Sequence, residues 1–270
     1  MSESIYPPKK ASNAAGHWTR EQLLLAFKFY CETPFGQLHS KNKKVIELAS
    51  LIGRTPGALA MKCVNFASLD PAIRASGRSG LSNASARDRD VWDAFHADWN
   101  GLIEECESLR AGLLREMNND ASTKKEDAET EPYFTGETRL AIIKQRIKQS
   151  FFRRTVLSGY GGKCCISGVT DQRLLVASHI VPWSDDTSIR LHPGNGLCLS
   201  AIHDKAFDSY LFSLTDDHRI LLSTQLKQTK DDFLQQVFWP AEDKPIAMPE
   251  KFSPERDFVA RHRAKMLSNA

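Results

Sequence analysis

The chain has 270 residues, 41% of them hydrophobic, and a formal net charge of +3. This length allows two modest globular domains, and the charge is too small to identify a nucleic-acid-binding protein by itself. No apolar run reaches membrane-spanning length, and the polar first residues lack the apolar core of a secretory signal. We therefore expect a cytoplasmic protein whose six cysteines are reduced thiols.

The front part of the chain, residues 1–117, has the pattern of an all-helical domain. Thr19 and Gln22 have the spacing of a capping box at the start of a helix. Leu23 and Phe27 then recur on one face of that helix and can enter a core.

Two further helices are expected to follow, separated by a tight turn. The first runs from about residue 41 to 52 and is ended by Gly53. Thr55 caps the next helix, with Pro56 at its first position. The spacing of Ala49, Gly53 and Leu59 is typical of a helix-turn-helix, which places its second helix in the major groove of DNA.

This interpretation predicts that Arg54, Lys62 and Asn65 contact DNA. An ordinary helical bundle with a tight turn has the same spacing, and both alternatives stay open. A longer helix is expected from about residue 86 to 117, and the helical spacing of its aromatic residues favours packing over base stacking.

Residues 118–135 separate this domain from the remainder of the chain, 136–270. The segment is polar, contains almost nothing that can enter a core, and is expected to be a linker. The second domain begins with a helix in which Ile143, Ile147 and Phe151 recur at helical spacing.

Residues 138–170 contain no Asp or Glu. The positive residues there are Arg139, Lys144, Arg146, Lys148, Arg153, Arg154 and Lys163. Acidic residues normally interleave with basic ones on a solvated face. A helix whose charged residues are all positive is therefore expected to contact phosphates. Such contacts position a duplex without reading its sequence.

The segment from residue 178 to 208 carries the strongest functional signal. His179 ends an apolar strand-like run that begins at Leu174. Asn195 lies in a Pro-Gly-Asn-Gly turn, and His203 lies on an amphipathic helix from about residue 199 to 210. The order of strand, loop, strand and helix can direct one base and one metal ion at a single phosphate.

Hydrolysis of a phosphodiester calls for these residue types. A neutral imidazole can take the proton of an attacking water near neutral pH, and His179 suits this role. A divalent ion can stabilise the charged oxygens of the phosphate, and His203 can bind it through a ring nitrogen. Asn195 is either a weak oxygen ligand of the metal or a residue that ties the loop between the strands, and we favour the second role.

This pattern resembles the HNH endonucleases, in the segments His-Ile-Val-Pro-Trp, Asn-Gly-Leu-Cys-Leu and His-x3-Phe-Asp. The resemblance implies an α+β protein with a ββα-metal nuclease domain, a divalent ion (Mg, Mn, Ni or Zn) and double-stranded DNA as the partner. It makes His179, Asn195 and His203 the catalytic residues, with His203 and Asn195 as candidate metal ligands. Ser178 stands where relatives often have Asp or His.

Two further features bear on this resemblance. Many relatives hold a structural zinc with two Cys-x-x-Cys pairs, whereas single cysteines cannot close a tetrahedral zinc site. We therefore expect no structural zinc, and interpret Cys164, Cys165 and Cys198 as core residues. The front part of the chain, about residues 17–73, more loosely resembles the front domains of some bacterial HNH restriction enzymes.

The last elements expected are a β-hairpin around residues 211–222 and a helix from about 254 to 267. The function expected overall is a metal-dependent restriction endonuclease, acting as a homodimer, that recognises a fixed sequence or modified cytosine. The alternative is a helix-turn-helix regulator whose nuclease domain has lost its metal.

Overall fold

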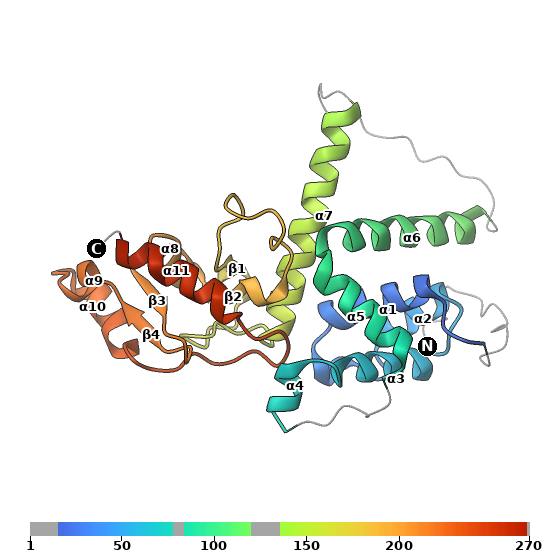
Figure 1. Ribbon diagram of the computed structural model, residues 1–270, viewed down its shortest axis with the longest axis horizontal. Helices are drawn as coiled ribbons and strands as arrows, with labels where there is room; N and C mark the ends of the chain where they lie inside the picture. Colours follow the sequence, from blue (N-terminus) through green and yellow to red (C-terminus); the bar gives the residue numbers. More distant parts are fainter. Residues whose placement is uncertain (1–15, 78–83, 120–135, 269–270) are drawn as a thin grey trace, which may run out of the picture. The chain divides into compact units, whose positions relative to one another are not determined.

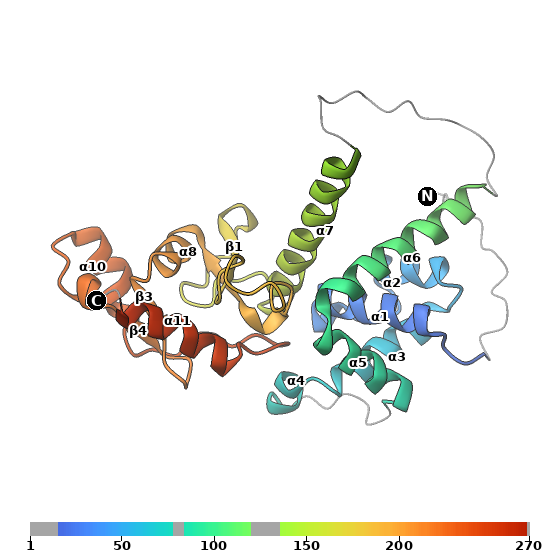
Figure 2. The ribbon, with the colours of Figure 1, turned by 45° about the horizontal axis from the view of Figure 1, so that its top comes forward.

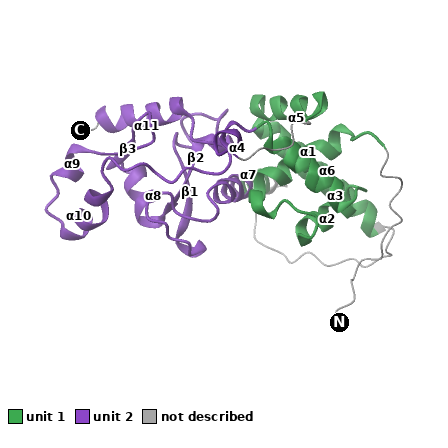
Figure 3. Cartoon of the chain, turned by 90° about the horizontal axis from the view of Figure 1, so that it is seen from below, with its two compact units in different colours: residues 1–69, 78–148 green, residues 70–77, 149–270 purple. Residues whose placement is uncertain are grey.

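A computed structural model describes residues 16–77, 84–119 and 136–268, although not the side chains of 119 and 136–140 (Figure 1). The chain divides into two compact units. Unit 1 comprises residues 1–69 and 78–148, and unit 2 comprises 70–77 and 149–270 (Figure 3). Most of the expected linker, 118–135, lies outside the described residues.

Unit 1 is helical throughout the part that the structure describes. Its elements are α1 (Arg20–Glu32), η1 (Phe35–Gln37), α2 (Lys43–Leu51), α3 (Pro56–Ala67), α5 (Ala86–Ala97), α6 (Trp99–Asn119) and the first part of α7 (Gly136–Gly159). Helix α1 packs against α3, α5 and α6 (Figure 2). At its centre the Phe27 ring lies 5.0 Å from Phe66 and 4.6 Å from Phe95, measured between centroids.

The start of α1 confirms the expected capping box. The Thr19 side chain accepts a hydrogen bond from the Gln22 backbone, and the Gln22 side chain accepts one from the Thr19 backbone. Helices α2 and α3 are likewise separated by the expected turn, in which Gly53 has a φ of +67°. Glycine adopts this left-handed conformation without steric cost, and the Arg54 amide then donates to the Ala49 carbonyl.

The helix expected from 86 to 117 is in fact two helices. Asp98 interrupts it with a φ of −148° and a ψ of 81°. Its Oδ1 accepts a hydrogen bond from the Gly101 amide at 2.9 Å, as a capping residue does. Phe95 and Trp99, on either side of the break, are buried in the core, which confirms their packing role.

Unit 2 contains the strands. Its elements are α4 (Pro71–Ala75), the end of α7, η2 (Gln172–Leu174), β1 (Leu175–His179), η3 (Pro193–Asn195), β2 (Gly196–Ser200), α8 (Ala201–Asp208), β3 (Phe212–Leu214), β4 (Ile220–Leu222), α9 (Thr224–Lys227), α10 (Asp232–Phe238), η4 (Trp239–Ala241) and α11 (Arg256–Ser268). Helix α8 packs on both β1 and β2, and α11 packs on β3.

Strands β1 and β2 are antiparallel, with Leu175 opposite Ser200 and His179 opposite Gly196. The expected hairpin is present as β3 and β4, which pair around a turn where His218 has a positive φ. The small sheet followed by a helix, beside a helical front part, confirms the α+β class. Among the described residues, no helix is long and apolar enough to cross a membrane.

One short segment of the front sequence belongs to unit 2. Helix α4 and its capping residue Asp70 lie within residues 70–77. The Asp70 carboxylate is almost completely buried and accepts a hydrogen bond from the Phe252 amide. The sequence gives no sign of this partner, which lies 182 positions away.

Candidate active site

The site is built on the ends of the two central strands. Ser178 and His179 close β1, Asn195 immediately precedes β2, and α8 begins after Ser200. A side chain at Gly196, opposite His179, would collide with Val156 and Phe152 of α7. The absence of a Cβ at this position therefore lets α7 lie against the strand that carries His179.

His179 has the geometry of a neutral base. Its Nε2 lies 3.1 Å from the Arg190 carbonyl oxygen, so Nε2 carries the proton and donates, which leaves the Nδ1 lone pair available. The ring stacks on Phe152 at 3.8 Å and meets the edge of Trp183 at 5.5 Å. Burial lowers the pKa of His179, although the Arg190 bond opposes this shift.

Asn195 ties the loop between the strands. It is fully buried. Its Oδ1 accepts from the Val181 amide at 2.8 Å, and its Nδ2 donates to the Val181 carbonyl at 3.1 Å. These bonds fit the loop-tying role that the sequence favours, and the role of Asn195 as a metal ligand stays a prediction.

His203 lies at the start of α8 and is buried. Its Nδ1 lies 2.7 Å from the Ser200 hydroxyl, and its ring packs against Phe238. The ring also hydrogen-bonds the Cys164 sulfur. Burial opposes ionisation of this thiol, but the bonds from His203 and Ser167 outweigh it and lower the pKa of Cys164 to about 6. The ring of His203 therefore has hydrogen-bond partners within the protein, and its role as a metal ligand stays a prediction.

Two carboxylates of α8, on the face next to that of His203, are better candidates than His203 for binding a metal ion. Asp204 and Asp208 are four residues apart, so they share one face of the helix. The buried Ser178 hydroxyl faces Asp204 without completing a well-formed hydrogen bond. Burial raises the pKa of Asp204, while Ser178 and Lys205 act to lower it. Burial and the charge of Asp204 raise the pKa of Asp208, while Lys205 acts to lower it.

This arrangement fits a hard divalent cation. Carboxylate and hydroxyl oxygens are ligands that such ions accept, with water completing the coordination. Among the described residues no three His, Cys, Asp or Glu side chains form a metal-binding group. A set of Ser178, Asp204 and Asp208 would need water to complete the coordination. The sequence signal was the i,i+4 aspartate pair directly after His203.

Most of the front residues that are expected to contact DNA have partners within the protein. The guanidinium of Arg54 donates to the carbonyls of Gly16 and His17 at 2.8 and 2.7 Å, and to Gln22 at 3.1 Å. Its carbon also lies 4.9 Å from the centroid of the Trp18 ring. These contacts fasten the residues before α1 to the turn before α3, and the DNA contact of Arg54 stays a prediction.

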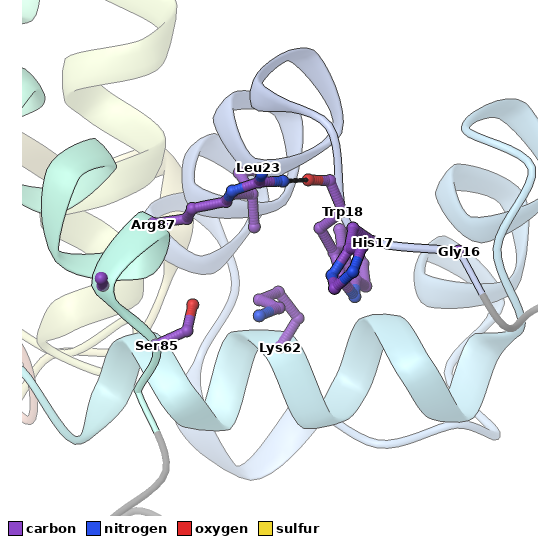
Figure 4. A pocket seen from close by; sticks show the side chains of 8 residues that line it. Gly16, His17, Trp18, Leu23, Lys62, Ser85 and Arg87 are labelled. Carbon is purple, nitrogen blue, oxygen red and sulfur yellow. Dashed lines mark hydrogen bonds between the residues drawn. The ribbon is translucent and has the colours of Figure 1, made fainter.

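Lys62 faces inward. Its ammonium is paired with the buried Asp88 carboxylate at 2.8 Å, and its side chain lines a cavity of about 480 Å³ together with Trp18 and Arg87 (Figure 4). Arg87 donates to the Trp18 carbonyl across this cavity. A direct DNA contact by Lys62 would require this buried ion pair to open, and the contact stays a prediction. The Oδ1 of Asn65 is also buried, which makes Asn65 a poor reader of bases.

The basic helix is present as α7, but several of its cations have partners. Within unit 1, Lys144 and Lys148 pair with Glu104 at 3.1 and 2.8 Å, which weakens their case as phosphate contacts. Arg153 donates to the carbonyls of Leu175 and Gln172. Exposed Arg146 and Arg154 remain candidates, while the side chain of Arg139 lies outside the described residues.

Two antiparallel strands with a helix packed on both form a small ββα unit. Residues 164–215 match a family model described as HNH endonuclease. This segment is therefore an HNH domain, and the likeness seen in the sequence is confirmed for it. No curated protein matches the chain.

Proposed function

We propose that this protein is a metal-dependent DNA endonuclease with His179 as the general base. The observation that carries the proposal is that the candidate base and a candidate metal ligand are adjacent residues of β1. His179 has Nε2 fixed by a carbonyl, and the preceding residue, Ser178, faces the Asp204 carboxylate. The oxygen ligands proposed beside the base are thus an aspartate pair and the Ser178 hydroxyl.

In this proposal the metal ligands are Asp204, Asp208 and Ser178, in place of His203.

The chain's own residues account for the proton and for the orientation of the base. Nδ1 of His179 accepts a proton from a water molecule, whose oxygen attacks phosphorus as the bond to the leaving nucleoside oxygen breaks. The leaving oxygen takes a proton from solvent and His179 later returns its own to solvent, so the products are a phosphate monoester and a hydroxyl. A divalent ion, when bound, supplies electrostatic stabilisation of the charge on the phosphate oxygens. Asn195 and the Arg190 carbonyl keep the loop and the imidazole in place.

The alternative is a helix-turn-helix regulator with an inactive HNH domain. Its support was the serine at position 178, where relatives often have an acid or a histidine. The aspartate pair on α8 offers two carboxylates to replace that ligand, which favours the enzyme. A nicking assay on supercoiled plasmid with magnesium, manganese, nickel or zinc decides between them, because the regulator binds DNA but does not cut under any of these ions.

A restriction role, in the cytoplasm and as a homodimer, is the finer part of the proposal. It rests on the loose resemblance of residues 17–73 and on the need to cut two strands. Unit 1 would select the DNA and unit 2 would cut it. Plasmids that differ only in cytosine modification test the choice between modified cytosine and a fixed sequence. Equal digestion of all of them would eliminate the modified-cytosine version.

A further inference from the structure

Arg190, in the loop between β1 and β2, lies next to the candidate base through its backbone. Its carbonyl oxygen accepts the hydrogen bond from His179 Nε2 at 3.1 Å. Any movement of the loop at Arg190 would therefore alter the orientation of the imidazole. The backbone contact persists whatever side chain stands at this position, so the guanidinium can be tested separately.

The side chain of Arg190 is held by Trp183. Its Nε donates to the Trp183 carbonyl at 2.7 Å, and its guanidinium carbon lies 5.1 Å from the centroid of the Trp183 ring. The same ring meets His179 at a centroid distance of 5.5 Å. A shared aromatic neighbour thus keeps the guanidinium close to the base and limits its rotamers, which lowers the entropic cost of binding a ligand.

The charge of Arg190 is not neutralised by the acids of its own loop. Asp185 pairs with Lys265, and Asp186 pairs with Arg261, both on α11. Within the part of the chain that the structure describes, neither terminal nitrogen of Arg190 has a hydrogen-bond or ion-pair partner. The side chain is only half-buried, so these donors remain open to an anion.

We propose that Arg190 binds a phosphate of the DNA strand being cut, and the inference rests on the proposed nuclease function. A guanidinium offers a planar pair of N–H donors that matches two phosphate oxygens. Its distance from His179 is limited by the Trp183 ring that both contact, which places the phosphate at or directly beside the scissile position.

The first test measures binding without cutting. Affinity of the full chain for a DNA duplex is followed by fluorescence anisotropy in EDTA over a range of salt concentrations. Arg190→Gln should weaken binding and reduce the slope of log affinity against log salt by about 0.9, the value for one phosphate contact. Arg173→Gln is the matched control, since it removes an equal charge from an exposed ion pair in unit 2 and should leave the slope unchanged. An unchanged slope for Arg190→Gln overturns the proposal.

The second test uses plasmid nicking with saturating metal. Arg190→Gln should lower kcat/KM about ten- to a hundredfold, the effect expected for one charge-assisted hydrogen bond. Arg190→Lys keeps the charge and should retain the salt slope, but it loses the planar pair of donors and should still nick more slowly than wild type. Wild-type nicking by Arg190→Lys would refute the paired contact, and this variant carries the test if Arg190→Gln does not fold.

The two tests separate this inference from the proposed function. If wild type does not nick under any metal while Arg190→Gln still changes the salt slope, the phosphate contact stands and the nuclease function fails. If wild type nicks and the slope is unchanged, the nuclease function stands and the contact fails. Oligonucleotides with one neutral methylphosphonate, placed at or beside the mapped cut, then identify which phosphate Arg190 binds, because only that substitution removes the difference between wild type and Arg190→Gln.

Discussion

Asp204 and Asp208 lie one turn apart on α8, and the charge of Asp204 contributes to raising the pKa of Asp208. Two neighbouring carboxylates that repel each other are stabilised when a cation binds between them. We predict that Asp204→Asn and Asp208→Asn each weaken the binding of manganese, measured by calorimetry, and reduce plasmid nicking. Loss of a residue that only orients a ligand costs about ten- to a hundredfold in affinity, so loss of a ligand should cost at least about tenfold.

The exposed aspartate of the β3–β4 turn, Asp217, provides a control of the same charge. Asp217→Asn should leave both manganese affinity and nicking unchanged. If Asp204→Asn and Asp208→Asn also bind manganese with wild-type affinity, the candidate metal site is elsewhere.

His203→Ala is predicted to affect stability more than metal binding. The variant removes the hydrogen bonds to Ser200 and Cys164 and leaves a gap beside Phe238. A lost buried hydrogen bond costs about 1–3 kcal/mol in the free energy of unfolding. Urea denaturation should show this loss, whereas calorimetry with manganese should show little change. A stable variant with greatly reduced manganese affinity would restore His203 as the ligand.

His179→Ala should abolish most cutting while the protein still folds and binds DNA. Removal of a general base commonly lowers the rate by about 10² to 10⁴, and the loop remains tied by the bonds between Asn195 and Val181. Single-turnover nicking measures the rate, and circular dichroism and anisotropy check the fold and the binding. Near wild-type nicking by this variant would exclude His179 as the base.

The sequence was sufficient to predict the frame of the site but not the surroundings of each side chain in it. The apolar strand before His179 and the turn at Asn195 are local signals, and both lie where they were expected. The choice between His203 and its neighbour Asp204 depends on a rotation of about 100° around the helix, which the periodicity of a short helix does not fix. Only the packing of His203 against Phe238 and Cys164 decides which side chain faces inward.

Long-range partners explain the other differences. Lys62 and Asp88 are 26 positions apart, and nothing in either segment alone indicates that they form a buried pair. The same holds for Lys148, whose charge is offset by Glu104 on another helix. Charge patterns along one segment therefore overestimated the number of cations that are available to DNA.

The stability of unit 2 should decrease as the pH falls, because of His262. Its ring is buried between the Ser213 hydroxyl and the Phe207 carbonyl. Burial, together with the charge of Lys265, lowers the pKa of His262 to about 4. The hydrogen bond to Phe207 acts in the opposite direction. Above an unfolded-state pKa of about 6.5 both states are neutral, and His262 adds no pH dependence.

Between pH 6.5 and about 4 the unfolded state binds a proton that the folded state does not, so stability decreases as pH falls. The loss from this residue is at most about 3 kcal/mol and ends near the folded pKa. Urea denaturation at a series of pH values measures it. His262→Gln should flatten the curve over this interval, and an equally steep curve for the variant would show that other groups cause the dependence.

Lys62, which the sequence predicts to contact DNA, is paired with the buried Asp88 carboxylate. Lys62→Met leaves the Asp88 carboxylate buried without its cation. Breaking a buried pair by removing one partner costs about 3–5 kcal/mol, so the denaturation midpoint of unit 1 should fall sharply. Adding Asp88→Asn to Lys62→Met should recover part of this loss, because the second change removes the uncompensated charge. The refolded double variant should bind DNA with the wild-type salt slope. A slope reduced by about 0.9 would mean instead that Lys62 leaves its pair to neutralise a phosphate.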